Sequence, residues 1–186
     1  MVIGWNGTHQ IFKELIEKVK PKTIIEVGSW HGQSAITMAK VVKELGLDTK
    51  IYCVDTWLGA LEFMDAKNDD TRDLHKKDGY PQVYYKFLQN IRDNNVDDII
   101  IPVPQTSRIA SMWFKEHKAT AELIYIDASH EYEDVKDDII NYLPLCTGVM
   151  FGDDFNNNQF PGVKQAVKEV LGEIEGGNFW VYNTNK

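Results

Sequence analysis

Five acidic side chains stand at or just past the ends of short apolar stretches. They are Glu26, Asp55, Asp127, Asp153 and Asp154. Carboxylates can hold a divalent cation, move a proton or accept hydrogen bonds from a ligand. His130, three residues after Asp127, adds a group able to exchange a proton near neutral pH. These side chains can act together only if the apolar stretches are neighbouring strands whose ends share one edge of a sheet.

A glycine-containing turn follows the first apolar stretch. Gly28, Ser29 and Gly32 belong to the run Glu-Val-Gly-Ser-Trp-His-Gly, residues 26–32. Glycines let the backbone turn tightly and let a ligand approach it closely. The spacing is GxxxG, whereas dinucleotide binders use GxGxxG, and Glu26 would repel a pyrophosphate. The turn therefore favours a ligand with a cationic end and no phosphate, with an ordinary structural turn as the alternative.

Asp55 closes the second apolar stretch, 23 residues after Gly32. This is about the offset at which an acid meets ribose hydroxyls in nucleotide-binding sheets. Thr56 and Trp57 come next, and we interpret Trp57 as a cover for an adenine ring. Together with the turn, Asp55 predicts a nucleoside ligand that lacks phosphate. A helix-capping role for Asp55 is the structural alternative.

A second polar group, Gln105-Thr106-Ser107, follows the third strand-like stretch. Its side chains either contact the adenine edge or cap the next helix, and the sequence favours neither. The predicted ligand contacts are therefore Glu26, Gly28, Ser29, Gly32, Asp55, Thr56, Trp57, Thr106, Ser107 and Asp127.

Short apolar stretches alternate with amphipathic ones along most of the chain. They predict strands at 24–27, 51–54, 99–103, 123–126 and 149–151, and helices at 8–20, 35–45, 81–94, 107–117, 132–142 and 162–171. Such alternation indicates a parallel sheet with helices on both faces. Thr8 is the expected cap of the first helix. Near the end, Gly176-Gly177 separates two strand-like runs, which predicts an antiparallel hairpin. We expect an α/β fold with a single doubly wound, mostly parallel, seven-stranded Rossmann-like sheet.

The chain is predicted to form one domain, residues 1–186, interrupted by a polar segment at 57–80. A structureless connection of this length inside a compact domain is unusual and often functional. We interpret residues 57–80 as a lid or acceptor-binding insertion over the ligand edge of the sheet.

Charge and composition exclude several classes of protein. The chain has 28 acidic and 20 basic residues, a net charge of −8, and it shows no basic run, so nucleic acid and anionic membranes are disfavoured as partners. No secretory signal or stretch of about 18 apolar residues occurs, which predicts a cytoplasmic protein. Cys53 and Cys146 lie in or beside apolar stretches without metal-ligand spacing, and we expect reduced core cysteines.

Several of these motifs together resemble a known family. Residues 26–32 and 52–55 are similar to the first two motifs of class I S-adenosylmethionine-dependent methyltransferases. Residues 124–132, 152–155 and 161–167 resemble the branch that contains the macrocin-type, metal-dependent sugar O-methyltransferases. The resemblance covers roughly residues 20–182. It also accounts for Glu26, because the cofactor carries a sulfonium instead of a phosphate.

The resemblance implies S-adenosylmethionine as cofactor and a divalent cation, Mg²⁺, as a second one. Carried over to this chain, Asp127, Asp153 and Asp154 are the metal ligands, and His130 is the general base beside the catalytic Asp127. The acceptor would be a small molecule, with transfer to a hydroxyl of a sugar or another small polar compound. The spacing agrees, since Asp153 follows Asp127 by 26 positions, which is enough for one helix and one strand.

Other functions stay open at this point. An NAD(P)-dependent oxidoreductase could use the same kind of sheet, although the GxxxG turn and Glu26 argue against it. A protein that binds a nucleoside without catalysis and a metal-assisted hydrolase are further alternatives. The oligomeric state is open, and a homo-oligomer is among the expectations.

Overall fold

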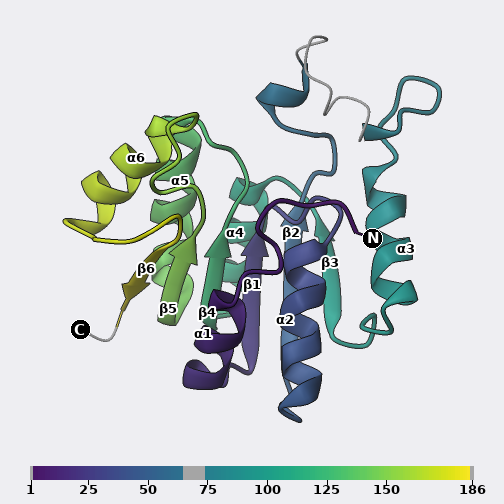
Figure 1. Cartoon of the computed structure of the whole chain (residues 1–186), viewed down its shortest axis with the longest axis horizontal. Helices are drawn as coiled ribbons and strands as arrows, with labels where there is room; N and C mark the ends of the chain where they lie inside the picture. Colours follow the sequence, from purple (N-terminus) through teal and green to yellow (C-terminus); the bar gives the residue numbers. More distant parts are fainter. Residues whose placement is uncertain (1, 65–73, 185–186) are drawn as a thin grey trace.

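In the computed structural model, which describes residues 2–64 and 74–184, one six-stranded sheet has the order β3-β2-β1-β4-β5-β6 (Figure 1). Five strands run parallel, and β6 is antiparallel to β5. The strands are β1 Thr23–Val27, β2 Lys50–Asp55, β3 Ile100–Pro104, β4 Ala121–Ile126, β5 Cys146–Gly152 and β6 Trp180–Asn183.

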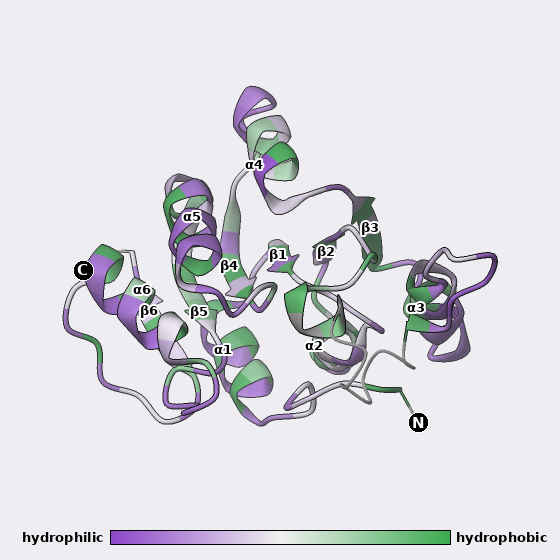
Figure 2. Ribbon diagram, turned by 90° about the horizontal axis from the view of Figure 1, so that it is seen from above, coloured by the Kyte–Doolittle hydropathy of each residue, from purple (hydrophilic) through white to green (hydrophobic). Residues whose placement is uncertain are grey.

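Helices cover both faces of the sheet, as Figure 2 shows from above. Helices α1, α2 and α3 pack through one apolar cluster that includes Phe12, Met38 and Phe87. Helices α4, α5 and α6 pack through a second cluster that includes Phe114 and Val167. The helices are α1 Ile11–Val19, α2 Gln33–Glu44, α3 Val83–Asp93, α4 Ser107–Glu116, α5 Tyr132–Tyr142 and α6 Pro161–Leu171.

The structure confirms the α/β class and the mostly parallel sheet, but the predicted count of seven strands is wrong. Residues 173–179 form no strand, and the carbonyls of residues 176–178 bind groups outside the sheet. The Asn156 side chain donates to the carbonyls of Gly176 and Gly177, and Phe155 N donates to Asn178 O. The antiparallel C-terminal edge is present nonetheless, since β6 pairs with β5.

Two smaller expectations also have outcomes. The first helix begins at Ile11, and its cap position is Gln10 without a side-chain cap, so Thr8 does not cap it. Cys53 and Cys146 are free and buried, as predicted.

Strand register brings the polar strand ends together. Val27 of β1 pairs with Val54 of β2 on one side and with Ile126 of β4 on the other, and Ile126 pairs with Gly152 of β5. The four strands thus end level, and the chain order reverses between β1 and β4. Ligands of open α/β sheets bind at such a switch point.

Two segments lie near this edge. The N-terminal segment before α1 crosses above β1 and β2 (Figure 1). Of the insertion predicted at 57–80, residues 65–73 lie outside the described part of the chain. Its described part includes a short 3-10 helix, η1, at Leu61–Met64 and a bridge between Lys77 and Tyr80. No helix within residues 2–64 and 74–184 has the length and apolar character needed to cross a membrane.

Candidate active site

A cavity of about 980 Å³ opens at the carboxyl edge of the sheet. Its described walls come from the N-terminal segment, the turn after β1, the ends of β2, β4 and β5, and the loop before α6. The predicted site residues that line it are Gly28, Ser29, Asp55, Thr56, Ser107, Asp127, His130, Asp153 and Asp154. Four predicted ligand contacts are absent from the described lining: Glu26, Gly32, Trp57 and Thr106.

Gly28 allows the turn after β1 to pack on the end of β4. Its φ is +89°, a left-handed conformation, and a Cβ there would lie 2.0 Å from the Asp127 carbonyl oxygen. Asp127 N also donates to Val27 O over 2.8 Å. Glycine is therefore required both by the backbone angle and by the lack of space.

Glu26 supports the turn from beneath instead of facing the cavity. Its buried carboxylate accepts hydrogen bonds from Ser29 Oγ at 2.6 Å and Ser34 Oγ at 2.5 Å, and Cys53 Sγ lies 3.3 Å away. Burial raises the pKa of Glu26, and the hydroxyl hydrogen bonds oppose that rise. The predicted direct contact between Glu26 and the ligand is thus not supported, because these side chains already surround its carboxylate.

Asp55 fixes the other side of the same turn while it lines the cavity. Its Oδ2 accepts from Ser29 N at 2.9 Å and Trp30 N at 2.8 Å, and its Oδ1 accepts from Trp57 N at 2.6 Å. Burial raises the pKa of Asp55, and the backbone donors partly offset this effect. The carboxylate is therefore held in one orientation at the end of β2.

The tryptophan that borders the cavity is Trp30 and not Trp57. Trp57 is buried, donates from Nε1 to Trp30 O at 2.8 Å, and packs on Tyr84 and Phe87. Trp30 instead lines the cavity and stacks on Phe63, with ring centroids 4.4 Å apart. The predicted role of Trp57 as a cover for adenine is wrong, because its ring fills the core between the sheet and α3.

The polar group after β3 is divided between the two roles that were left open. Thr106 caps α4 by accepting from Ile109 N, so it has the structural role. Gln105 and Ser107 line the cavity, and the Ser107 hydroxyl also donates to Asp138.

The buried carboxyl of Asp138 should make the free energy of unfolding depend on pH. Burial raises the pKa of this Asp to about 7, against the effect of the Ser107 hydrogen bond. An unfolded Asp ionises near 3.9, so between about pH 4 and pH 7 the unfolded state releases its proton first and stability falls as pH rises. Asp138→Asn removes this loss and keeps an acceptor for Ser107. We expect its free energy of unfolding, relative to the original chain, to rise by roughly 3 kcal/mol across that range.

Urea unfolding at both ends of the range measures this effect. Glu133→Gln changes an exposed carboxylate on the same helix and serves as the control. A difference for Asp138→Asn that does not vary with pH would contradict the assignment.

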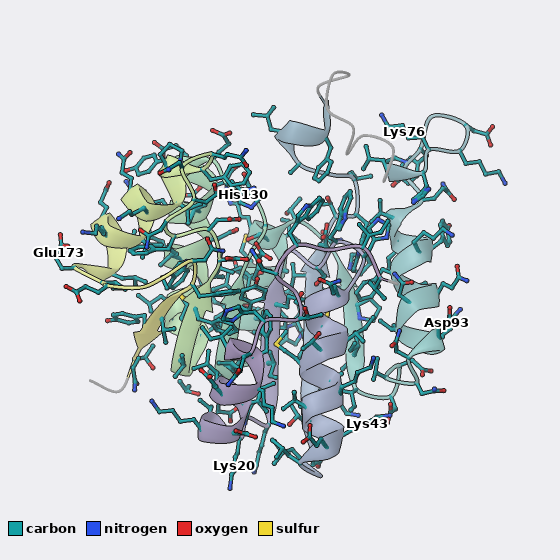
Figure 3. The ribbon with its side chains drawn as sticks, in the orientation of Figure 1. Lys20, Lys43, Lys76, Asp93, His130 and Glu173 are labelled. Atoms are coloured by element: carbon teal, nitrogen blue, oxygen red, sulfur yellow. The ribbon has the colours of Figure 1, made fainter. Side chains whose placement is uncertain are left out.

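Asp127, His130 and Asp154 converge at the ends of β4 and β5. One ligand atom from each lies within 4.8 Å of the others, and His130 Nε2 is 3.1 Å from Asp154 Oδ2. Figure 3 shows His130 at the top of the sheet, above these strands. Tyr125 OH donates to Asp127 Oδ2 at 2.7 Å, and the Phe160 ring stacks on His130 at 4.0 Å.

Asp153 stands beside this group but is held by other donors. Asn6 Nδ2 donates to Asp153 Oδ2 at 3.1 Å, Asp154 N donates to Oδ1 at 2.7 Å, and Asn178 also donates to Oδ1. The three side chains whose possible ligand atoms converge are thus Asp127, His130 and Asp154, with Asp153 beside them. Asn6 and Asn178 were not predicted, since they are remote in sequence and carry no motif.

Burial and neighbouring charges shift the pKa values of the acid group. Burial, followed by the charge of Asp153, raises the pKa of Asp127 well above its usual value. Burial also raises the pKa of Asp153. For Asp154, burial acts upward, but hydrogen bonds to His130 and Asn157 outweigh it and lower the pKa. Neighbouring carboxylates that raise one another's pKa are stabilised by an opposite charge between them.

Comparisons with known proteins identify the family of the chain. Residues 25–155 match the family described as "Methyltransferase domain". A protein of Sinorhizobium fredii named "Uncharacterized protein y4gI" is 26% identical over 133 residues, which are 70% of this chain and 12% of that protein. The chain therefore spans only about an eighth of the length of this relative.

Solved structures with a similar fold include three methyltransferases. The calicheamicin methyltransferase CalS11 superposes with a TM-score of 0.65 at 17% identity, over 95% of this chain and 77% of that one. The O-methyltransferase NovP superposes with a TM-score of 0.66 at 19% identity, over 94% of this chain and 78% of that one. An O-methyltransferase from Bacillus cereus in complex with SAH superposes with a TM-score of 0.64 at 14% identity, over 97% of this chain and 82% of that one.

The family match covers the turn after β1, the strand ends and the acid group, and these solved structures have a similar overall fold. The chain therefore belongs to the methyltransferase domain family and has the fold of the class I S-adenosylmethionine-dependent methyltransferases.

Proposed function

We propose that this chain transfers a methyl group from S-adenosylmethionine to a hydroxyl of a small polar acceptor, with a sugar as the leading candidate, and that a divalent cation assists. The observation that carries the proposal is the convergence of Asp127, His130 and Asp154 beside the cavity that the glycine turn borders. CalS11 is titled a TDP-rhamnose 3'-O-methyltransferase, which supports a sugar acceptor.

The cofactor half of the cavity follows from the turn and β2. Gly28 lets the turn after β1 pack against the end of β4 and borders the cavity. Asp55 presents a fixed carboxylate at the end of β2 that can accept from ribose hydroxyls. Gln105 and Ser107 stand at the end of β3 for the adenine edge. When bound, the cofactor would supply the methyl group from its sulfonium, and the acids along this edge would favour that positive charge.

The acid group fits a divalent cation. Carboxylate oxygens suit Mg²⁺, which keeps several positions for water or substrate oxygens. Asp127 and Asp154 would hold the ion, and Asp153 lies close enough to raise the pKa of Asp127 by its charge. With Asp153 as third ligand the set is all oxygen, whereas His130 as third ligand would favour a transition metal. When bound, the cation would stabilise negative charge on the acceptor oxygen.

His130 would then take the acceptor proton. An aliphatic hydroxyl with a pKa near the ~15.7 of water is about 8 units too weak an acid at neutral pH, or roughly 11–12 kcal/mol. A general base supplies about 10²–10⁴-fold, or roughly 3–5 kcal/mol. Asp154 orients the His130 ring through Nε2, and Phe160 packs on its face. Positioning and charge stabilisation must supply much of the remainder.

Calorimetry with S-adenosylhomocysteine tests the cofactor directly. We expect binding in the micromolar range, about −8 kcal/mol, and no comparable binding of NADH. Absence of S-adenosylhomocysteine binding at millimolar ligand would refute the proposal, and tight NADH binding would favour the oxidoreductase. Loss of methyl transfer in chelator, restored by Mg²⁺, would separate an enzyme that needs the cation from one that does not.

A further inference from the structure

The charge of the cavity restricts its acceptor. Five carboxylates line its described walls, and no lysine or arginine does so within residues 2–64 and 74–184: the acids are Asp55, Asp127, Asp134, Asp153 and Asp154. Two lysines on the neighbouring helices are bound elsewhere, Lys136 to Glu169 at 2.7 Å and Lys164 to Asn156 at 2.8 Å. Phosphate and carboxylate ligands are ordinarily held by such cationic groups. Five carboxylates exceed the two positive charges of the proposed divalent cation, so these walls would repel an anionic acceptor even with that ion bound.

An apolar rim faces the same cavity. Trp5 and Leu61 line it although they are 54% and 65% exposed. The Trp5 ring lies 6.4 Å from the rings of Trp30 and Phe63, which stack on each other. Trp30 Nε1 is buried and has no hydrogen-bond partner within the described residues. Exposed aromatic faces with a nearby unsatisfied donor suit a ligand that has both an apolar face and an oxygen.

Contacts of the N-terminal segment fix Trp5 at this position. The neighbouring residue, Asn6, donates to Asp153 Oδ2 at 3.1 Å. On both sides of this pair the backbone packs on Gln33 of α2, since a Cβ at Gly4 or Gly7 would lie 2.8 Å from its side chain. The Cα atom of Trp5 therefore lies about 3.8 Å from the Cα atom of Asn6, whose side chain contacts the acid group.

We propose that the acceptor is a hydroxylated ring without phosphate or carboxylate, neutral or cationic, whose apolar face packs on Trp5 while one hydroxyl reaches His130 and Asp154. This inference rests on the proposed function and names its substrate class. It separates the chain from an enzyme titled for TDP-rhamnose, whose substrate carries a diphosphate.

Matched probes test the charge of the acceptor. Methyl glucoside, glucosamine and glucose 1-phosphate share one ring and differ in charge, while catechol and dopamine provide an aromatic ring. Binding to the full chain with S-adenosylhomocysteine and Mg²⁺ is followed by ligand-observed NMR. We expect at least one of the neutral or cationic probes, either the sugars or the aromatic rings, to bind. Glucose 1-phosphate should bind at least about 10-fold more weakly than that probe. Preference for glucose 1-phosphate, or no binding by any probe, would overturn the proposal.

Substitution of Trp5 tests the platform. We expect Trp5→Ala to weaken the bound probe about 2- to 10-fold, the range of one aromatic contact, and Trp5→Phe to restore most of it. Trp113→Ala removes a tryptophan of similar exposure from α4 and is the control. Equal effects of Trp5→Ala and Trp113→Ala would refute the role of Trp5. S-adenosylhomocysteine binding should stay unchanged in all three variants, and its absence in the original chain would instead refute the proposed function.

Discussion

Asp154→Asn is expected to lower kcat at least about 100-fold, with S-adenosylhomocysteine affinity almost unchanged. The substitution removes the charge that faces His130 Nε2 at 3.1 Å and one ligand of the proposed cation. The backbone gives a reason to choose Asn. Asp154 has a φ of +58°, and Asn adopts this left-handed conformation more readily than most residues. The fold should therefore survive, and the loss should appear in turnover.

A matched variant separates this effect from a general loss of negative charge. Glu133→Gln neutralises an exposed acid in the first turn of α5, outside the described cavity lining. Methyl transfer and Mg²⁺ dependence should be measured for both variants by the release of S-adenosylhomocysteine. If Asp154→Asn kept the activity of Glu133→Gln, the acid group would have no part in the reaction.

Gly28→Ala should have the largest effect on structure. The new Cβ would lie 2.0 Å from the Asp127 carbonyl oxygen and 2.5 Å from Ala128 Cα, both of them backbone atoms of the segment after β4. The turn or the end of β4 must move, and the left-handed φ adds about 1–2 kcal/mol. We expect a loss of about 3 kcal/mol or more in the free energy of unfolding. Because the clash lies between the two halves of the cavity, S-adenosylhomocysteine binding should be lost as well.

Gly46→Ala is the control for the backbone angle alone. Gly46 also has a positive φ, +62°, but nothing lies within 4 Å of its Cβ position. Urea unfolding should show a loss of only about 1–2 kcal/mol for this variant, with cofactor binding intact. Similar losses for the two variants would mean that the close approach of Gly28 to Asp127 contributes nothing.

The sequence by itself determined the mostly parallel sheet and the edge at which its polar strand ends gather. Apolar stretches alternate with amphipathic ones, and parallel strands bring their carboxyl ends to one side, so Asp55, Asp127 and Asp154 could be placed together before any contact was known. The turn at Gly28 was also predictable from the sequence, because a left-handed backbone in close contact requires glycine.

Only the tertiary structure decided which groups face the cavity. Glu26 and Trp57 carry the right residue types but turn into the core, where hydroxyls and aromatic rings surround them. Asn6 reaches Asp153 across 147 positions of sequence. The seventh strand fails for a similar reason, since Asn156 satisfies the carbonyls of Gly176 and Gly177. Local patterns specify backbone periodicity, whereas the orientation of a side chain depends on partners that are distant in sequence and become neighbours only when the chain folds.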